Sequence, residues 1–115
     1  KRISILFMIL CFSCENNIEE DYAALNDCSE AEVYYQQNIV SIMLENCTGC
    51  HSASNPSGSL SLEDFNSTAD AIRDGSIIDR VNLEPSNSLF MPLGSEKLSQ
   101  EQLQAIQDFS NILCL

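Results

Sequence analysis

The sequence predicts an all-α domain over residues 27–115. Apolar residues recur at three- and four-residue steps in two long segments, and no segment shows sustained alternation of apolar and polar residues. Stretches rich in Ser, Gly and Pro separate the predicted helices. With 115 residues, the chain has room for one domain with a modest core.

The first predicted helix covers residues 31–46, with Ser29 as its N-cap residue and Glu32 three positions later. The CTGCH segment lies at the end of this helix, and its His51 is the first residue of a loop with the sequence HSASNPSGS. The face of the helix that we expect to be buried carries Val33, Gln37, Val40, Met43, Leu44 and Cys47.

A short second helix is predicted over residues 67–74. Ser67 is its expected N-cap residue, Asp70 completes the capping box, and Gly75 ends the helix. We expect the next stretch, which carries Pro85, to be a loop.

The last predicted helix begins after Ser99, which forms a capping box with Gln102, while Leu98 and Leu103 form a hydrophobic staple across the cap. Its expected buried face carries Leu103, Ile106, Phe109, Ile112 and Leu113.

Residues 1–13 have the pattern of a secretory signal peptide, because a basic start is followed by about ten apolar residues, too few to span a bilayer. Its end resembles a bacterial lipobox, which predicts that Cys14 is lipidated and begins an acidic tether over residues 14–26. A signal peptide without lipidation is the alternative. We therefore expect a lipid-anchored domain on the periplasmic or cell-surface side of a bacterial membrane.

The chain is strongly acidic, with 17 Asp and Glu residues against five Lys and Arg and a net charge of −12. Loss of Lys1 and Arg2 with the signal would leave three cations and a net charge of −14. Such a surface repels nucleic acids and anionic lipids, and it suits a partner protein with a basic patch. Acidity that serves solubility alone is the alternative.

The segment CTGCH, from Cys47 to His51, is the attachment signature of c-type haem. Two thiols three positions apart can add to the vinyl groups on one porphyrin edge, and the imidazole of His51 can then ligate the iron. A zinc site needs a fourth ligand. A redox-active dithiol usually stands at the start of a helix in a βαβ setting, whereas this pair follows a predicted helix end. One covalent haem c is thus the expected cofactor, with a redox dithiol as the main alternative.

The second axial ligand must differ in type, because His51 is the one histidine of the chain. Met8 lies in the signal, and Met43 lies one turn before CTGCH, too close to reach the opposite haem face. Met91 remains, and Pro92 favours an extended backbone there. We expect Met91 to ligate the iron, with a core-filling methionine as the alternative.

These motifs resemble the class I cytochrome c family, and the resemblance covers about residues 35–115. It consists of a helix ending in CTGCH, the stretch SLSLEDF, a short helix, a Met-Pro loop and a final helix, as in compact cytochrome-c-like domains of bacterial exported lipoproteins. It implies three to four helices around one covalently bound haem, with the first and last helices packed across each other. The final helix lacks the tryptophan common in the family, and we expect Phe109 to fill that space.

The resemblance assigns Cys47 and Cys50 to the thioether bonds, His51 to the proximal iron ligand and Met91 to the distal ligand. With both axial positions filled, the protein would be an electron carrier that serves redox partner proteins, not an enzyme. One rival is a haem enzyme subunit or ligand-binding haem module with an open distal site. Another is a structural lipoprotein in which the CTGCH cysteines form a plain disulfide.

Of the six cysteines, Cys11 leaves with the signal peptide, and the two still unassigned are Cys28 and Cys114, at the edges of the domain. Leftover thiols in an oxidising compartment tend to pair, so we expect a disulfide, with two buried free thiols as the alternative.

A haem propionate would also need a cation, and the mature chain offers Arg73, Arg80 and Lys97, each of which could instead be simply solvated.

Overall fold

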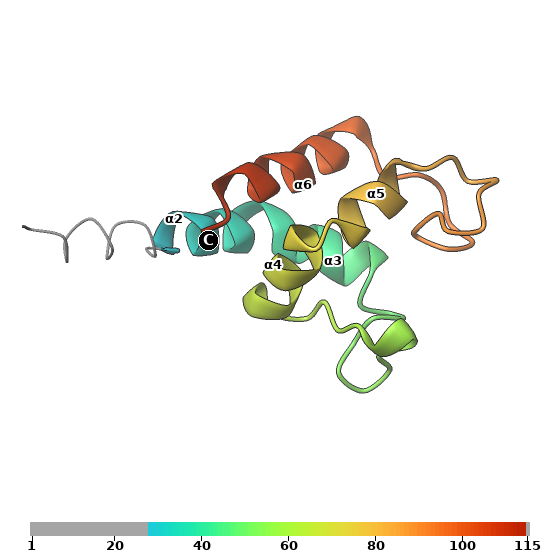
Figure 1. Cartoon of the computed structure of the whole chain (residues 1–115), viewed down its shortest axis with the longest axis horizontal. Coiled ribbons are helices and arrows are strands. Elements are labelled where there is room, and N and C mark those ends of the chain that lie inside the picture. The colour runs from blue at the N-terminus through green and yellow to red at the C-terminus, as the bar shows by residue number, and fades with distance from the viewer. Residues whose placement is uncertain (1–27, 115) are drawn as a thin grey trace, which may run out of the picture.

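Four helical segments and no strand make up residues 28–114, the part of the chain that the computed structural model describes (Figure 1). The all-α prediction is confirmed for these residues. The first segment runs without a break over residues 29–46 and includes a π-helical turn. The other three segments are separate helices, and turns or loops precede each of them. In order, the elements are α2 (Ser29–Tyr34), the π-helical turn η1 (Tyr35–Ile39), α3 (Val40–Asn46), the 3₁₀ turn η2 (Ser57–Ser59), α4 (Phe65–Arg73), α5 (Ser76–Asn82) and α6 (Gln100–Ile112).

Helix α6 holds the domain together, since it contacts α2, η1, α4 and α5 (Figure 1). Phe109 of α6 is fully buried, and its ring packs against those of Tyr34, Tyr35 and Phe65 at centroid distances of 6.3, 5.7 and 6.0 Å. Ile106 is buried beside it in the same core. The first and last helices therefore pack together, with a phenylalanine at the centre. The rest of the predicted face, Leu103, Ile112 and Leu113, is half-buried.

The buried face of the first helix differs from the predicted one. Val33 and Leu44 are 56% and 61% exposed, and Gln37 is exposed as well, so these three predictions are wrong. The residues that are buried instead, together with the correctly predicted Met43, are Ala31, Tyr35, Ile39 and Ile42.

A π-helical turn lies within the buried face, over Tyr35–Ile39. The N–H of Val40 donates to the carbonyl of Tyr35, an i→i+5 bond that places one extra residue in the turn. In a regular α-helix, each residue four positions further along the chain is rotated slightly around the helix axis. The extra residue of the π-helical turn counteracts this rotation, so Tyr35 and Ile39 lie on the same buried face. Apolar residues recur at three- and four-residue steps on both faces of this helix, so periodicity alone did not decide which face is buried.

Two predicted N-caps are also wrong. Helix α2 begins at Ser29 itself, and Cys28 is the N-cap residue, whose carbonyl accepts from the N–H of Glu32 at 2.9 Å. Helix α4 is capped by Asp64, whose carboxylate accepts from the N–H of Ser67 at 3.0 Å and from its hydroxyl at 2.8 Å. These bonds hold the pKa of Asp64 below its usual value. An aspartate one turn earlier thus takes the role assigned to the serine.

Other signals agree with the structure. Gly75 adopts a left-handed conformation with φ of 81° just after α4, and Ser99 and Gln102 make both hydrogen bonds of the predicted capping box. The expected loop after Gly75, however, begins with helix α5. Ile77 and Val81 are its buried residues, and their four-residue spacing was the available signal.

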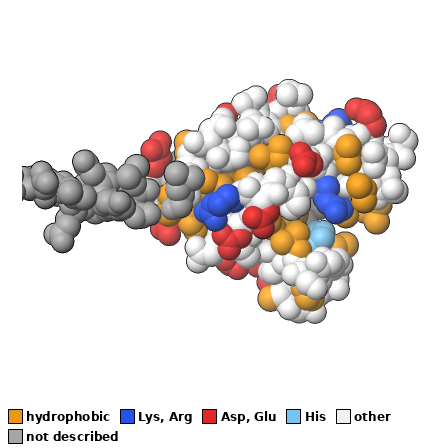
Figure 2. Space-filling view, in the orientation of Figure 1, with side chains coloured by type: hydrophobic (Ala, Val, Ile, Leu, Met, Phe, Trp, Pro, Cys, Tyr) orange, Lys and Arg blue, Asp and Glu red, His pale blue; other side chains and the backbone are white. Residues whose placement is uncertain are grey.

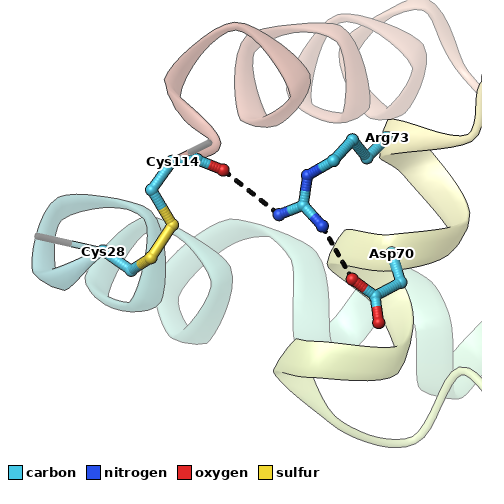
Figure 3. The surroundings of a disulfide bond; sticks show 4 residues. All are labelled: Cys28, Asp70, Arg73 and Cys114. Carbon is cyan, nitrogen blue, oxygen red and sulfur yellow. Dashed lines mark hydrogen bonds and ion pairs between the residues drawn. A yellow bond between two sulfur atoms is a disulfide. The ribbon is translucent and has the colours of Figure 1, made fainter. Parts of the chain in front are cut away.

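The two ends of the described domain meet at a disulfide between Cys28 and Cys114, whose Cα atoms lie 5.3 Å apart (Figure 3). Arg73 of α4 donates to the carbonyl of Cys114 at 3.1 Å and forms an ion pair with Asp70 at 2.7 Å. The structure therefore contains the predicted pairing, and a third helix contacts it.

Candidate functional site

The CTGCH segment forms a compact turn at the end of α3. Cys47 is the C-cap residue of the helix, and its N–H donates to the carbonyl of Met43 at 2.9 Å. The chain then folds back, because the N–H groups of Cys50 and His51 both donate to the carbonyl of Cys47, at 3.1 and 2.9 Å. Both thiols are free. The turn thus holds two cysteines and the histidine within one hydrogen-bonded unit.

The loop that follows fixes the position of His51. The carbonyl of His51 accepts from the N–H of Leu62 at 2.8 Å, and the carbonyl of Cys50 accepts from the N–H of Ser57 at 3.0 Å. The Nδ1 atom of His51 is buried and has no hydrogen-bond partner among the described residues. Figure 2 shows the histidine side chain, in pale blue, at the molecular surface. One side of the imidazole therefore faces inward, and the ring still reaches solvent.

The two cysteines have different environments. Cys47 is half-buried, and burial raises the pKa of its thiol to about 11. Cys50 is exposed. A thiol with a raised pKa is mostly protonated at neutral pH, so Cys47 is a weak nucleophile and a weak metal ligand in this state.

Met91 lies in the segment between α5 and α6. Its N–H donates to the carbonyl of Arg80 at 3.2 Å, and the Met91–Pro92 peptide bond is cis. The preceding Phe90 is only 2% exposed, yet it lies outside the main hydrophobic core. Met91 itself is half-buried. The segment is therefore anchored beside Met91 by one buried ring and one backbone bond to the end of α5.

The rest of this segment is tied to the same helix end. Lys97 donates to the carbonyl of Asn82 at 3.0 Å and pairs with Glu84 at 3.2 Å. Phe90 was not among the predicted residues, and the available signal was an aromatic residue directly before the Met-Pro pair.

The CTGCH loop and the Met91 segment lie at the end of the domain opposite Cys114 (Figure 1). Among residues 28–114, no hydrogen bond joins the two segments. The structure brings Cys47, Cys50 and His51 together in sequence and space, but it shows no direct bond between this group and Met91.

Exposed leucines flank both segments. Leu44 lies one turn before CTGCH, where its carbonyl accepts from the hydroxyl of Thr48 at 3.3 Å. Leu89 and Leu93 lie two positions on either side of Met91 and are 54% and 72% exposed. Three of the four large exposed apolar side chains of the described residues are therefore next to a predicted iron ligand or attachment segment.

Within residues 28–114, no three His, Cys, Asp or Glu side chains are grouped so that they could hold a metal ion. Two open hollows, of about 510 and 450 Å³, are lined by residues of neither the CTGCH turn nor the Met91 segment. The larger is lined by Glu32, Val33, Gln36, Gln37 and Phe65, and the smaller lies between Tyr34 and Asn38 on one side and α6 on the other.

The predicted signal at residues 1–13, the lipidated Cys14 and the tether at residues 14–26 lie outside the described residues. Within the described part of the chain, no helix has both the length and the apolar character that a membrane crossing requires.

Comparison of the chain with protein-family models, with curated proteins and with solved structures found no match.

Proposed function

We propose that this protein is an exported, lipid-anchored c-type cytochrome that transfers single electrons. Cys47 and Cys50 would hold one haem through thioether bonds, and His51 and Met91 would be the axial ligands of its iron. The haem would supply reversible one-electron chemistry between Fe(III) and Fe(II), and a Met thioether opposite His favours the reduced iron.

The observation that carries the proposal is the closed CTGCH turn, which presents two free thiols beside one half-buried imidazole. Leaving Nδ1 of His51 buried without a partner costs about 1–3 kcal/mol. Because Nδ1 faces inward, the other ring nitrogen is the one that remains for the iron, and ligation there would keep the proton on Nδ1. Two free thiols and one such imidazole nitrogen are the donor set that a covalent haem requires.

The exposed leucines support the same site. An apolar porphyrin seated between the two segments would remove Leu44, Leu89 or Leu93 from water, and burial of apolar surface is favourable. In the described part of the chain, these three side chains are more than half exposed and lie close in sequence to the CTGCH and Met91 segments.

The redox dithiol is disfavoured by the environment of Cys47. Reactive dithiols depend on a lowered thiol pKa at a helix N-terminus, whereas Cys47 caps a helix C-terminus and has a raised pKa. The plain Cys47–Cys50 disulfide of a structural lipoprotein is not formed here either.

The proposal is tested by haem-stained denaturing electrophoresis of the exported protein, because only covalent haem survives denaturation. We expect a stained band for the wild type and none for the C47A/C50A double variant. The C28A/C114A double variant, which alters cysteines at the other end of the domain, is the matched control and should keep the stain. A colourless wild type overturns the proposal.

The alternative of a haem module with an open distal site is distinguished by the ferric spectrum. If Met91 ligates the iron, the wild type shows the long-wavelength band of a Met–iron bond, Met91→Leu loses it, and Met43→Leu keeps it. High-spin ferric iron in the wild type would favour the open-site alternative.

The anchor and the partner belong to the same proposal. Lipidation at Cys14 predicts that Cys14→Ala releases the exported protein from the membrane fraction, whereas a plain signal peptide predicts no change. The acidic surface predicts that transfer to a redox partner with a basic patch slows as ionic strength rises.

A further inference from the structure

The described residues contain three cations, and two of them have anionic partners. Arg73 pairs with Asp70 at 2.7 Å, and Lys97 pairs with Glu84 at 3.2 Å. Arg80 has no ion pair and no side-chain hydrogen bond within the described part of the chain. It is half-buried.

The lack of a partner for Arg80 is unusual in a chain with a net charge of −12. One turn before it on α5 lies the buried Ile77, and one turn after it lies Glu84, which already pairs with Lys97. A half-buried guanidinium normally lies along apolar surface and directs its charged end to an anion or to water. No described acidic side chain takes that position.

Arg80 also has a fixed relation to the proposed site. Its carbonyl accepts the N–H of Met91, so the same turn of α5 positions both residues. In Figure 2 a Lys or Arg side chain, in blue, lies beside the pale-blue histidine on one face of the domain. Positive charge and the proximal imidazole therefore share that face.

We propose that Arg80 binds a carboxylate of the haem, an inference that rests on the proposed function. Haem carries two propionate groups, and a partly buried carboxylate requires a charged or hydrogen-bonding partner. The planar guanidinium matches a carboxylate with two parallel N–H···O bonds. Arg80 is the one described cation whose charge is not already engaged by an acidic side chain.

The test is the reduction potential of the holoprotein for three variants. Reduction adds negative charge to the haem, so loss of a nearby positive charge disfavours it. We expect Arg80→Gln to lower the equilibrium constant for reduction about tenfold, which is ~59 mV for a one-electron couple. Arg80→Lys should recover most of the loss. The matched control Arg73→Gln, at the disulfide end of the domain, should stay within about twofold of the wild type.

Each outcome decides a different point. If the wild type carries haem and the reduction potentials of Arg80→Gln and Arg73→Gln are equal, the role of Arg80 is overturned. The proposed function then remains intact. An Arg80→Lys potential as low as that of Arg80→Gln assigns the effect to packing and also overturns it. If Arg80→Gln yields no holoprotein, the comparison of Arg80→Met with Arg73→Met, which removes the charge and keeps an apolar stem, decides in the same way. A wild type without haem overturns both proposals.

Discussion

At the scale of single residues, the two cysteines of the CTGCH turn should react differently before any cofactor is attached. The pKa of the Cys47 thiol is raised to about 11 by burial, and Cys50 is exposed. Alkylation requires the thiolate, whose fraction at a given pH falls tenfold for each unit of raised pKa. In chain produced without haem attachment, we expect iodoacetamide at pH 8 to label Cys50 at least tenfold faster than Cys47, as measured by peptide mass spectrometry.

The pH dependence of this difference follows from the direction of the shift. The raised pKa means that the folded state keeps the Cys47 proton, so this group contributes stability below its ordinary pKa of 9.0 and loses that contribution as pH rises towards 11. The labelling rate of Cys47 should therefore continue to rise above pH 9. Single-cysteine variants Cys50→Ser and Cys47→Ser are the controls, and equal rates at pH 8 would contradict the burial of Cys47.

The residue-scale motif was predictable because it is local. The spacing of Cys47, Cys50 and His51 is visible in five letters, and a single turn brings them together. Arg80 could be assigned no role beyond that of the other two cations, because its lack of a partner depends on which acids Arg73 and Lys97 engage. The Arg73–Asp70 pair is local to one helix, but the Lys97–Glu84 pair joins residues 13 apart and is a tertiary contact that sequence spacing does not reveal.

At the scale of elements, the π-helical turn is the feature that sequence periodicity missed. The turn accommodates an extra residue between Tyr35 and Ile39, and both of these residues stay in the core. The capping box predicted at Ser99 is formed, because no neighbouring side chain takes the N-cap position in its place. At the start of α4, Asp64 competed with Ser67 and is the N-cap residue instead.

Removal of one exposed residue from this turn should be tolerated. Deletion of Gln37 leaves the buried positions at steps of four, three and four residues, a spacing that a regular α-helix keeps on one face. Deletion of the exposed Gln107 in α6 is the control, because it moves Phe109 off the face that carries Ile106, at a cost comparable to loss of a buried aromatic ring, about 3–5 kcal/mol.

The measurement is the free energy of unfolding from urea titrations followed by circular dichroism. We expect the Gln37 deletion to be at least about 2 kcal/mol more stable than the Gln107 deletion. Equal losses for the two deletions would show that the π-helical turn is required for packing and does not merely accommodate an extra residue.

At the scale of the whole molecule, the domain has two structurally different ends. The disulfide and Arg73 lie at one end, and the CTGCH loop and the Met91 segment lie at the other (Figures 1 and 3). The packing of the first helix against the last connects them through Phe109. The relative placement of the CTGCH and Met91 segments was not predictable from sequence, since no hydrogen bond joins them within the described residues.

This division predicts that the disulfide stabilises the fold without affecting the proposed haem site. Cys28 and Cys114 are 86 residues apart in sequence, and closing a loop of that length removes unfolded-state entropy worth about 4–5 kcal/mol in the chain-entropy model. We expect C28S/C114S to lose a free energy of unfolding of that order in urea titrations, and reductant to destabilise the wild type but not the variant. The ferric spectrum and haem stain of C28S/C114S should match those of the wild type, because the bonds that hold Met91 and His51 involve neither Cys28 nor Cys114. Loss of the Met–iron band in this variant would mean that the two ends are coupled through the helices, contrary to the separation inferred from the fold.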